Sequence, residues 1–184
     1  MTLTEFLNER GFTELEGYSQ GLPLQVEDLI DLSQGCSNIM EIGFNGGHSA
    51  EIFLKNTTAT VTSFDLGYHP YVSTGKEYID TLFPNRHTLI LGDSKETVPL
   101  CNDTFDLIFI DGGHDYETVK ADIENCRRLA KPNAIVIVDD TMYTVGWEQA
   151  YTIYPTQSWL ESGIIELGRK DYQLGRGMSW GRYS

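Results

Sequence analysis

This 184-residue sequence has only three cysteines, few basic residues and no long apolar run. Cys36, Cys101 and Cys126 are odd in number and lack C-x-x-C spacing, so the sequence predicts neither a disulfide framework nor a cysteine zinc cluster. No apolar stretch reaches the roughly 20 residues of a membrane-spanning helix, and the first residues, mixed in charge, do not resemble a secretory signal. We therefore expect a soluble, cytoplasmic protein that does not enter a membrane.

The scarcity of basic residues bears on the partners of the protein. Lysine and arginine number 13 against 27 aspartate and glutamate residues, which gives a formal net charge of −14. A protein that binds DNA or RNA usually presents a basic surface that neutralises phosphates. The small basic cluster of Arg127, Arg128 and Lys131 lies at the expected end of a helix, where positive charge complements the helix dipole. The composition therefore argues against a nucleic-acid partner.

Five apolar segments of strand length are spread along the chain and predict strands. They cover residues 38–42, 59–64, 87–91, 105–111 and 134–140. The 40% hydrophobic content suffices for a substantial core, and no linker or repeat divides the sequence. We therefore expect one domain over residues 1–184, with strands that alternate with helices.

Helical patterns separate the expected strands. No strong helical pattern precedes Pro23, which opens a helix that Gly35 closes, so residues 1–35 are expected to form an N-terminal helical or lid segment. Asp115 is suited to cap a helix with an apolar stripe that ends at residues 131–133, and a further helix is expected over residues 145–154.

Two late strands are expected over residues 163–168 and 177–182, joined through residues 169–171. Because they lie close together in the sequence, they predict an antiparallel pair added to a parallel sheet. The predicted fold is therefore α/β and Rossmann-like: a seven-stranded, mostly parallel sheet with an antiparallel C-terminal strand pair and helices on both faces.

A glycine-rich turn from Gly43 to Gly47 follows the first expected strand and opens a helix whose first amides point back to the turn. A dinucleotide-binding fingerprint would need glycine at the position of Asn45, and a phosphate-binding P-loop would need a lysine after Gly47. Both of these classes are therefore disfavoured. Glycines in the turn still allow the backbone to approach a ligand closely.

Each of the five expected strands finishes with an acidic residue at or next to its carboxyl end. These residues are Glu41, Asp65, Asp93, Asp111 and the pair Asp139 and Asp140. Ligands of open parallel sheets bind beyond these strand ends, and an acid at the end of the second strand is placed to accept hydrogen bonds from both ribose hydroxyls. Any single aspartate is as well explained as a helix cap or turn residue. Acidic residues at the ends of all five strands, however, favour a shared site.

Together these motifs resemble the class I S-adenosylmethionine-dependent methyltransferases, over about residues 22–182. The resemblance implies the methyltransferase fold and S-adenosylmethionine as cofactor, with Glu41 near the amino-acid end of the cofactor and Asp93 near its adenine. The cofactor-binding residues that it implies are Glu41, Gly43, Asn45, Gly47, His48, Ser49, Asp65, Asp93, Ser94 and Asp111.

The segment from Phe105 to Tyr116, with the later Asp139 and Asp140, resembles the metal-dependent O-methyltransferases of the catechol and macrolide-sugar types. That resemblance implies that Asp111, Asp139 and Asp140 bind a divalent metal. Hard oxygen ligands favour Mg²⁺, with manganese or calcium as alternatives. It also implies that His114, together with Asp111, is catalytic, the histidine taking the proton of an acceptor hydroxyl that the metal activates.

The acceptor is a small molecule on this interpretation, and a sugar hydroxyl, a small phenol and a carboxylate all stay open because the N-terminal lid is short. We expect Tyr18, Tyr143 and Trp147 to rim the acceptor pocket. A homodimer that completes the pocket is an open alternative, as is a non-catalytic partner subunit that binds S-adenosylmethionine or another nucleoside.

Overall fold

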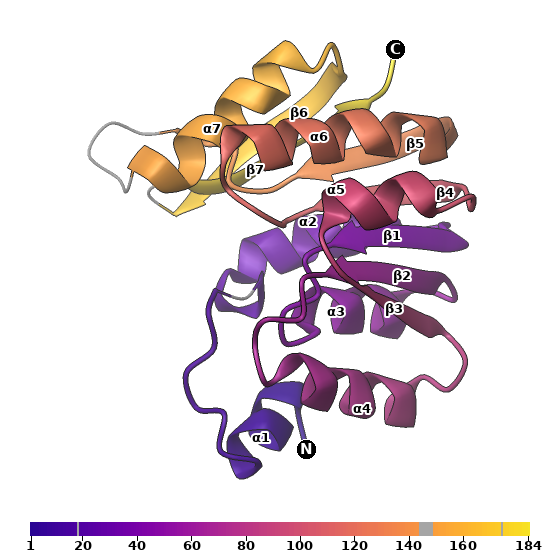
Figure 1. The fold of residues 1–184 in the computed structure, drawn as a ribbon, viewed down its shortest axis with the longest axis vertical. Helices are drawn as coiled ribbons and strands as arrows, with labels where there is room; N and C mark the ends of the chain where they lie inside the picture. Colours follow the sequence, from indigo (N-terminus) through magenta and orange to yellow (C-terminus); the bar gives the residue numbers. More distant parts are fainter. Residues whose placement is uncertain (18, 144–148, 174) are drawn as a thin grey trace.

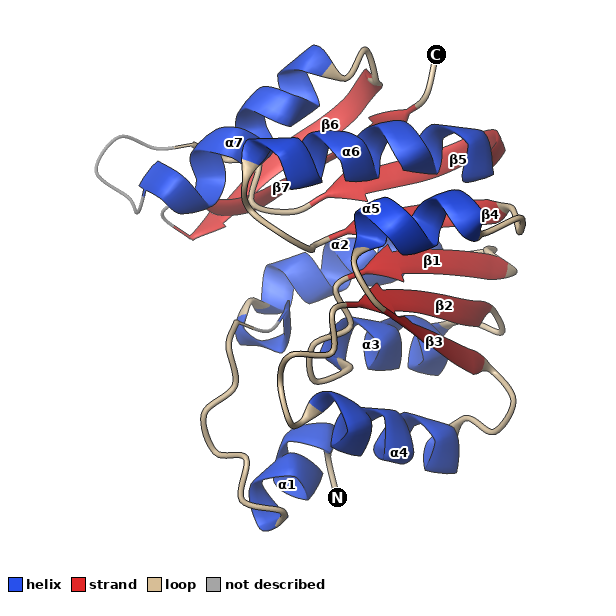
Figure 2. Ribbon diagram, in the orientation of Figure 1, coloured by secondary structure: helices blue, strands red, loops and turns tan. Residues whose placement is uncertain are grey.

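A computed structural model gives the fold of the chain and describes residues 1–17, 19–143, 149–173 and 175–184. One sheet lies between two layers of helices (Figure 1), and Figure 2 separates these layers by colour. The strands are β1 Asn38–Ile42, β2 Thr60–Asp65, β3 His87–Leu91, β4 Phe105–Ile110, β5 Ala130–Val138, β6 Ile165–Gln173 and β7 Arg176–Arg182. The α-helices are α1 Leu3–Glu9, α2 Pro23–Ser33, α3 His48–Asn56, α4 Val72–Leu82, α5 Ser94–Thr97, α6 Tyr116–Cys126 and α7 Gln149–Glu161.

The strand order in the sheet is β3-β2-β1-β4-β5-β7-β6. Strands β1 to β5 pair in parallel, whereas β7 is antiparallel to both β5 and β6. The predicted seven-stranded sheet with its antiparallel C-terminal pair is therefore confirmed. The strand order reverses between β1 and β4, which is where open α/β sheets form their ligand crevice.

Alternation along the central strands fills two cores, one on each face of the sheet. Ile39 and Phe109 belong to the core shared with α1 to α4, whereas their neighbours Met40 and Ile108 belong to the core shared with α6 and α7. All four side chains are 0% exposed, so both faces of the sheet are covered. Truncation of Phe109 to alanine would cost about 3–5 kcal/mol, as is usual for a buried aromatic side chain.

The N-terminal segment, which was expected to be helical or a lid, begins with helix α1, whose bounds the sequence analysis did not predict. In α1, the Thr2 hydroxyl accepts a hydrogen bond from the backbone N–H of Glu5, and the Glu5 carboxylate accepts one from Thr2. This capping box is a readable start signal, and the buried Leu3 and Leu7 then anchor α1 in the core beside α4.

Several predicted boundaries were wrong or lie outside the described residues. Helix α6, which was expected to end at residues 131–133, ends at Cys126, and strand β5 begins at Ala130 and ends at Val138. Asn133 takes a positive φ of 68° within this strand. Residues 169–171 belong to β6, since they pair with β7, and do not form a connection. Helix α7 begins at Gln149, and residues 145–148 of the predicted helix lie outside the described part of the chain. Within the described ranges, no helix combines the length and apolar character needed to cross a membrane.

Candidate active site

A cavity of about 970 Å³ lies beyond the carboxyl ends of β1 to β5. Its walls come from the loops that follow these five strands, and from residues 15–17, helix α2, helix α7 and the start of β7. The backbone ladder continues one residue past the strands, because Asp111 N–H donates to Ile42 O and Asp139 N–H donates to Ile110 O, both at 2.9 Å. This shared register places the acids that follow β4 and β5 at the same edge of the sheet as the glycine turn that follows β1.

The glycine turn after β1 packs directly against the loop after β4. Gly43 has φ +98°, and a Cβ atom there would lie 1.9 Å from the carbonyl oxygen of Asp111, so only glycine allows this approach. Asn45 also takes a positive φ, 51°, and its backbone N–H donates to Asp65 Oδ2 at 2.8 Å. Gly43, Asn45 and Asp65, which the sequence predicts to bind the cofactor, all line the cavity.

Asp65 lies at the end of β2 with a carboxylate that backbone amides hold in place. Its Oδ2 accepts from Asn45 N–H, and its Oδ1 accepts from Gly67 N–H at 2.7 Å. A carboxylate has about four lone-pair positions, so each oxygen keeps capacity for a further donor such as a ribose hydroxyl. Asp93 and Ser94 line the same cavity after β3, where Asp93 also caps α5 through Lys95 N–H.

Residues 15–17, termed the strap, lie against this part of the cavity. The Asn45 side chain donates to the backbone carbonyls of Glu16 at 2.5 Å and of Gly17 at 2.9 Å. The Glu16 carboxylate pairs with His69 Nε2 at 2.8 Å, and Glu16 N–H donates to the Tyr71 hydroxyl. The glycine turn therefore fixes the strap as well as the carboxylate of Asp65.

Glu41 is placed differently from the prediction. Its side chain is 0% exposed and is absent from the cavity wall, and its two carboxylate oxygens accept hydrogen bonds from the hydroxyls of Ser49 and Ser63, both at 2.6 Å. Burial raises the pKa of Glu41 to about 7, although both serine hydroxyls oppose the rise. Glu41 and Ser49 therefore connect β1, β2 and α3 beneath the turn.

Gly47 and His48 are also outside the cavity wall. Gly47 has φ +93° and begins α3, where a Cβ atom would lie 2.8 Å from Phe44 Cζ. His48 is buried, its Nε2 lies 3.1 Å from Thr4 Oγ1, and burial lowers its pKa to about 4. Both residues support the turn from the side facing α1.

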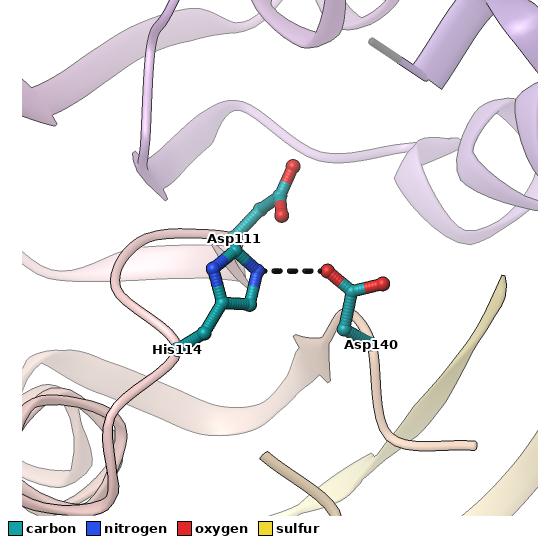
Figure 3. A group of neighbouring side chains, drawn as sticks. All are labelled: Asp111, His114 and Asp140. Carbon is teal, nitrogen blue, oxygen red and sulfur yellow. Dashed lines mark hydrogen bonds and ion pairs between the residues drawn. The ribbon is translucent and has the colours of Figure 1, made fainter. Parts of the chain in front are cut away.

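Asp111, His114 and Asp140 form the most concentrated group of metal-ligating side chains among the described residues. One ligand atom from each lies within 4.8 Å of the others. Figure 3 shows that Asp111 and His114 come from the loop after β4, and that His114 points to Asp140, with Nε2 2.9 Å from Asp140 Oδ2. Asp140 has φ 56°, a conformation that non-glycine residues rarely adopt and that often marks functional sites.

Asp139, which the sequence predicted as a metal ligand, is outside this group. Both of its carboxylate oxygens accept from Gln25 Nε2 at 2.9 Å, and its Oδ1 also accepts from Asp140 N–H. Gln25 is 2% exposed and comes from α2, so Asp139 is turned toward that helix. Arg176 lines the same end of the cavity, and its positive charge stabilises the ionised form of Asp139.

The electrostatics of this end are dominated by buried acids that repel one another. Burial raises the pKa of Asp111 well above its usual range, and the carboxylates of Asp139 and Asp140 raise it further. Burial also raises the pKa of Asp139 to about 7. Burial lowers the pKa of His114, but the hydrogen bond to Asp140 and the charges of Asp140 and Asp111 outweigh this effect and raise it. A cation at this position would relieve the repulsion.

Sequence reasoning missed several residues of the cavity wall, among them Gln25, Tyr151 and Arg176. They belong to α2, α7 and β7, and no local motif marks them. Of the aromatic residues predicted to rim the pocket, Tyr143 does not line the cavity. Tyr18 and Trp147 lie outside the described residues.

The residues present fit both groups that the sequence implied. The volume suits a nucleoside cofactor together with a small acceptor, because ligand cavities usually measure about 300–1,000 Å³. Asp65 offers acceptor capacity at one end, and Asp111 and Asp140 offer oxygen ligands beside an imidazole at the other. Mg²⁺ is commonly held by one or two carboxylates and keeps several waters, so this donor set suits it.

Comparison with known proteins agrees with this geometry. Residues 40–141, more than half of the chain, match the family model described as a methyltransferase domain, whereas no curated protein matches the sequence. The fold resembles cofactor-bound Rv0187 from MTB, with 19% identity, a TM-score of 0.78 and coverage of 98% of this chain and 87% of that one. It also resembles the O-methyltransferase from Bacillus cereus in complex with SAH (S-adenosylhomocysteine), with 20% identity, a TM-score of 0.72 and coverage of 98% and 90%.

A third similar structure is the SAH-bound methyltransferase PaMTH1 from Podospora anserina, with 19% identity, a TM-score of 0.70 and coverage of 99% of this chain and 86% of that one. At these identities the structures establish the fold, and the sequence match establishes the family. The chain therefore belongs to the methyltransferase domain family and is a class I S-adenosylmethionine-dependent methyltransferase.

Proposed function

We propose that the protein transfers the methyl group of S-adenosylmethionine to an oxygen atom of a small-molecule acceptor, with Mg²⁺ held by Asp111 and Asp140 and with His114 as general base. The observation that carries this proposal is the group of Asp111, His114 and Asp140 within 4.8 Å, in the same cavity as Asp65. An ordinary cofactor-binding domain would not need a histidine and two carboxylates brought together there.

The cavity residues after β1, β2 and β3 have different parts in the proposed binding of the cofactor. Asp65 accepts hydrogen bonds from the ribose hydroxyls, the turn at Gly43 and Asn45 passes beneath the cofactor, and Asp93 and Ser94 face its adenine. Asp111 and His114, in the loop after β4, line the same cavity and would lie beside the methyl acceptor. Asp111 and Asp140 would hold a divalent cation, which would supply a Lewis acid that lowers the pKa of an acceptor hydroxyl.

The residues of the site account for the bond that breaks and for the proton that leaves during methyl transfer. The acceptor oxygen attacks the methyl carbon in line with the carbon–sulfur bond, which breaks and leaves neutral S-adenosylhomocysteine. His114 takes the proton of the acceptor, and Asp140, at 2.9 Å from His114 Nε2, stabilises the imidazolium that forms. The main contribution of the protein is to align the two reactants and exclude water.

Calorimetry tests the binding part of the proposal. We expect S-adenosylhomocysteine to bind and NAD not to bind. Asp111→Asn and Asp140→Asn should weaken the binding of Mg²⁺ or Mn²⁺, whereas Asp103→Asn, on an exposed loop, is the matched control and should not. Unchanged metal binding in both site variants would remove the metal from the proposal.

Turnover tests the chemical part. A panel containing a small phenol, a sugar and a carboxylate, assayed with and without chelator, identifies the class of acceptor. His114→Gln should lower kcat by about 100-fold while cofactor affinity is retained, as is usual for loss of a general base. Tight binding of S-adenosylhomocysteine without turnover of any oxygen acceptor would instead favour the non-catalytic partner subunit.

A further inference from the structure

Tyr151 of α7 lies against the imidazole of His114, the proposed base. Its ring stacks on the His114 imidazole, with centroids 3.9 Å apart and planes inclined by 25°. His114 is therefore held from two directions, by the Tyr151 ring on its face and by Asp140 Oδ2 at its Nε2. This contact limits rotation of the imidazole about its side-chain bonds.

The Tyr151 hydroxyl faces the cavity. Tyr151 lines the cavity wall, and a Cβ atom at Gly17 would lie 3.9 Å from its hydroxyl oxygen, so this oxygen reaches from α7 toward the strap. Within the described part of the chain, this hydroxyl makes no hydrogen bond to another residue.

Two other largely buried aromatic side chains, those of Tyr183 and Trp159, find a partner for their polar atom inside the protein. The Tyr183 hydroxyl donates to Ile123 O at 2.8 Å, and Trp159 Nε1 donates to Glu166 Oε2 at 2.7 Å. Such pairing is usual, because an unpaired polar atom in a buried place costs free energy. Tyr151 differs in that its ring is packed while its hydroxyl is directed into a cavity, which is the arrangement expected when a ligand supplies the partner.

We propose that Tyr151 is a positioning residue of the acceptor end, whose ring fixes the plane of His114 and whose hydroxyl donates a hydrogen bond to a second oxygen of the acceptor, beside the oxygen that is methylated. This inference rests on the proposed oxygen transfer and narrows the acceptor to molecules with two neighbouring oxygens. Tyr151 itself takes no proton and forms no bond in the reaction.

Three variants separate the two parts of this proposal. Tyr151→Phe keeps the stacked ring and removes the hydroxyl, whereas Tyr151→Leu removes both. The matched control is Tyr154→Phe on the same helix, because Tyr154 is 41% exposed, contacts Tyr116 and does not line the cavity. Thermal unfolding and calorimetry with S-adenosylhomocysteine first establish that each variant is folded and binds the cofactor product.

Proton NMR of the four histidines measures the stacking without any acceptor. The His114 ring resonances, identified by their loss in His114→Gln, should lie upfield because the Tyr151 ring shields them. Tyr151→Phe and Tyr154→Phe should keep these positions, and Tyr151→Leu should move the resonances downfield. Unchanged His114 resonances in a folded Tyr151→Leu would overturn the positioning role of the ring.

Kinetics with catechol and phenol as probe acceptors measure the hydroxyl. For catechol, Tyr151→Phe should raise KM about 5- to 10-fold with little change in kcat, as expected for loss of one hydrogen bond. For phenol, which lacks the second oxygen, the same variant should have no effect. Equal KM changes for both probes, or no change for either, would overturn the hydrogen bond to the acceptor.

Failure of the proposed function has a different signature. If the wild-type protein binds S-adenosylhomocysteine but methylates neither probe nor the sugar and carboxylate of the acceptor panel, the result contradicts the oxygen acceptor and the narrowing to two neighbouring oxygens. The His114 resonances in Tyr151→Leu still decide whether the ring orients the imidazole. Absence of S-adenosylhomocysteine binding to the wild-type protein would instead reject the cofactor site.

Discussion

Replacement of Glu41 by glutamine distinguishes a buried structural acid from a direct cofactor ligand. The resemblance to the methyltransferase family implied contact with the cofactor, yet the Glu41 carboxylate is 0% exposed and bonds to the hydroxyls of Ser49 and Ser63 at 2.6 Å. Glutamine has the same shape, accepts a hydrogen bond from one serine and donates one to the other. The variant therefore changes the charge with little change in packing.

The magnitude follows from the pKa of Glu41, which burial raises from 4.5 to about 7. Because the folded protein then holds this proton more tightly than the unfolded chain, stability falls as the pH rises from about 4.5 to about 7 and stays reduced above. Ionisation of Glu41 lowers the free energy of unfolding, relative to a permanently protonated side chain, by about 3 kcal/mol at pH 8 and by about 1 kcal/mol at pH 5. The glutamine amide makes weaker hydrogen bonds to the two serines, which lowers the free energy of unfolding by about 1 kcal/mol at both pH values. Glu41→Gln should thus be more stable than the wild type by about 2 kcal/mol at pH 8 and equal to it at pH 5.

Urea unfolding at both pH values measures this difference, and calorimetry measures the affinity for S-adenosylhomocysteine. We expect the affinity to stay within about two- to threefold, because Glu41 shares no contact with the cavity. Glu77→Gln is the control, since Glu77 is an exposed acid and should show no such dependence on pH. A variant that is destabilised at pH 8, or that loses most of its affinity, would refute this interpretation of Glu41.

Three other predictions concern the cofactor, a second buried acid and the metal. Asp65→Ala should weaken binding of S-adenosylhomocysteine about 10- to 100-fold in calorimetry, because a charged acceptor for the ribose hydroxyls is lost. Burial raises the pKa of Asp122 to about 7, so Asp122→Asn should stabilise the protein in urea unfolding at pH 8 and leave it unchanged near pH 4; equal effects at both values would exclude this cause. Chelation should abolish methyl transfer to an oxygen acceptor but preserve S-adenosylhomocysteine affinity, and turnover that survives chelation would refute the metal's part.

The parallel half of the fold was predictable because its signals are local. The segment Asn38–Ile42 has the bounds that the sequence indicated, since an apolar run between turn residues is enough to mark a buried strand. The extent of β6 and the start of β5 were not predictable in the same way. Residues 169–171 are polar, and only pairing with β7 brings them into the sheet. Residues 131–133 lie in β5 between Ala130, which pairs with Phe105, and Ile135, which pairs with Leu107, at a shift in register that no local pattern marks.

The sequence was enough to predict where the acids of the site lie in the sheet, but not which way their side chains point. The sequence placed acids after β4 and β5, and the parallel register then brings Asp111 and Asp140 together. It could not indicate that Asp139 turns to Gln25, which is 114 residues away in the sequence. The stacking of Tyr151 on His114 likewise depends on the path of α7 over the sheet.

The two halves of the cavity differ in where their residues come from. Asp65, Asp93 and the glycine turn lie within residues 40–141, the range that matches the methyltransferase family, and so do Asp111 and Asp140. Tyr151, Arg176 and Gln25 line the proposed acceptor end from outside that range. Family membership therefore bears on the cofactor and the strand-end acids, whereas we expect the choice of acceptor to depend on segments that the family pattern does not contain. Substitutions outside residues 40–141 are thus the ones expected to change which acceptor is methylated while cofactor affinity is preserved.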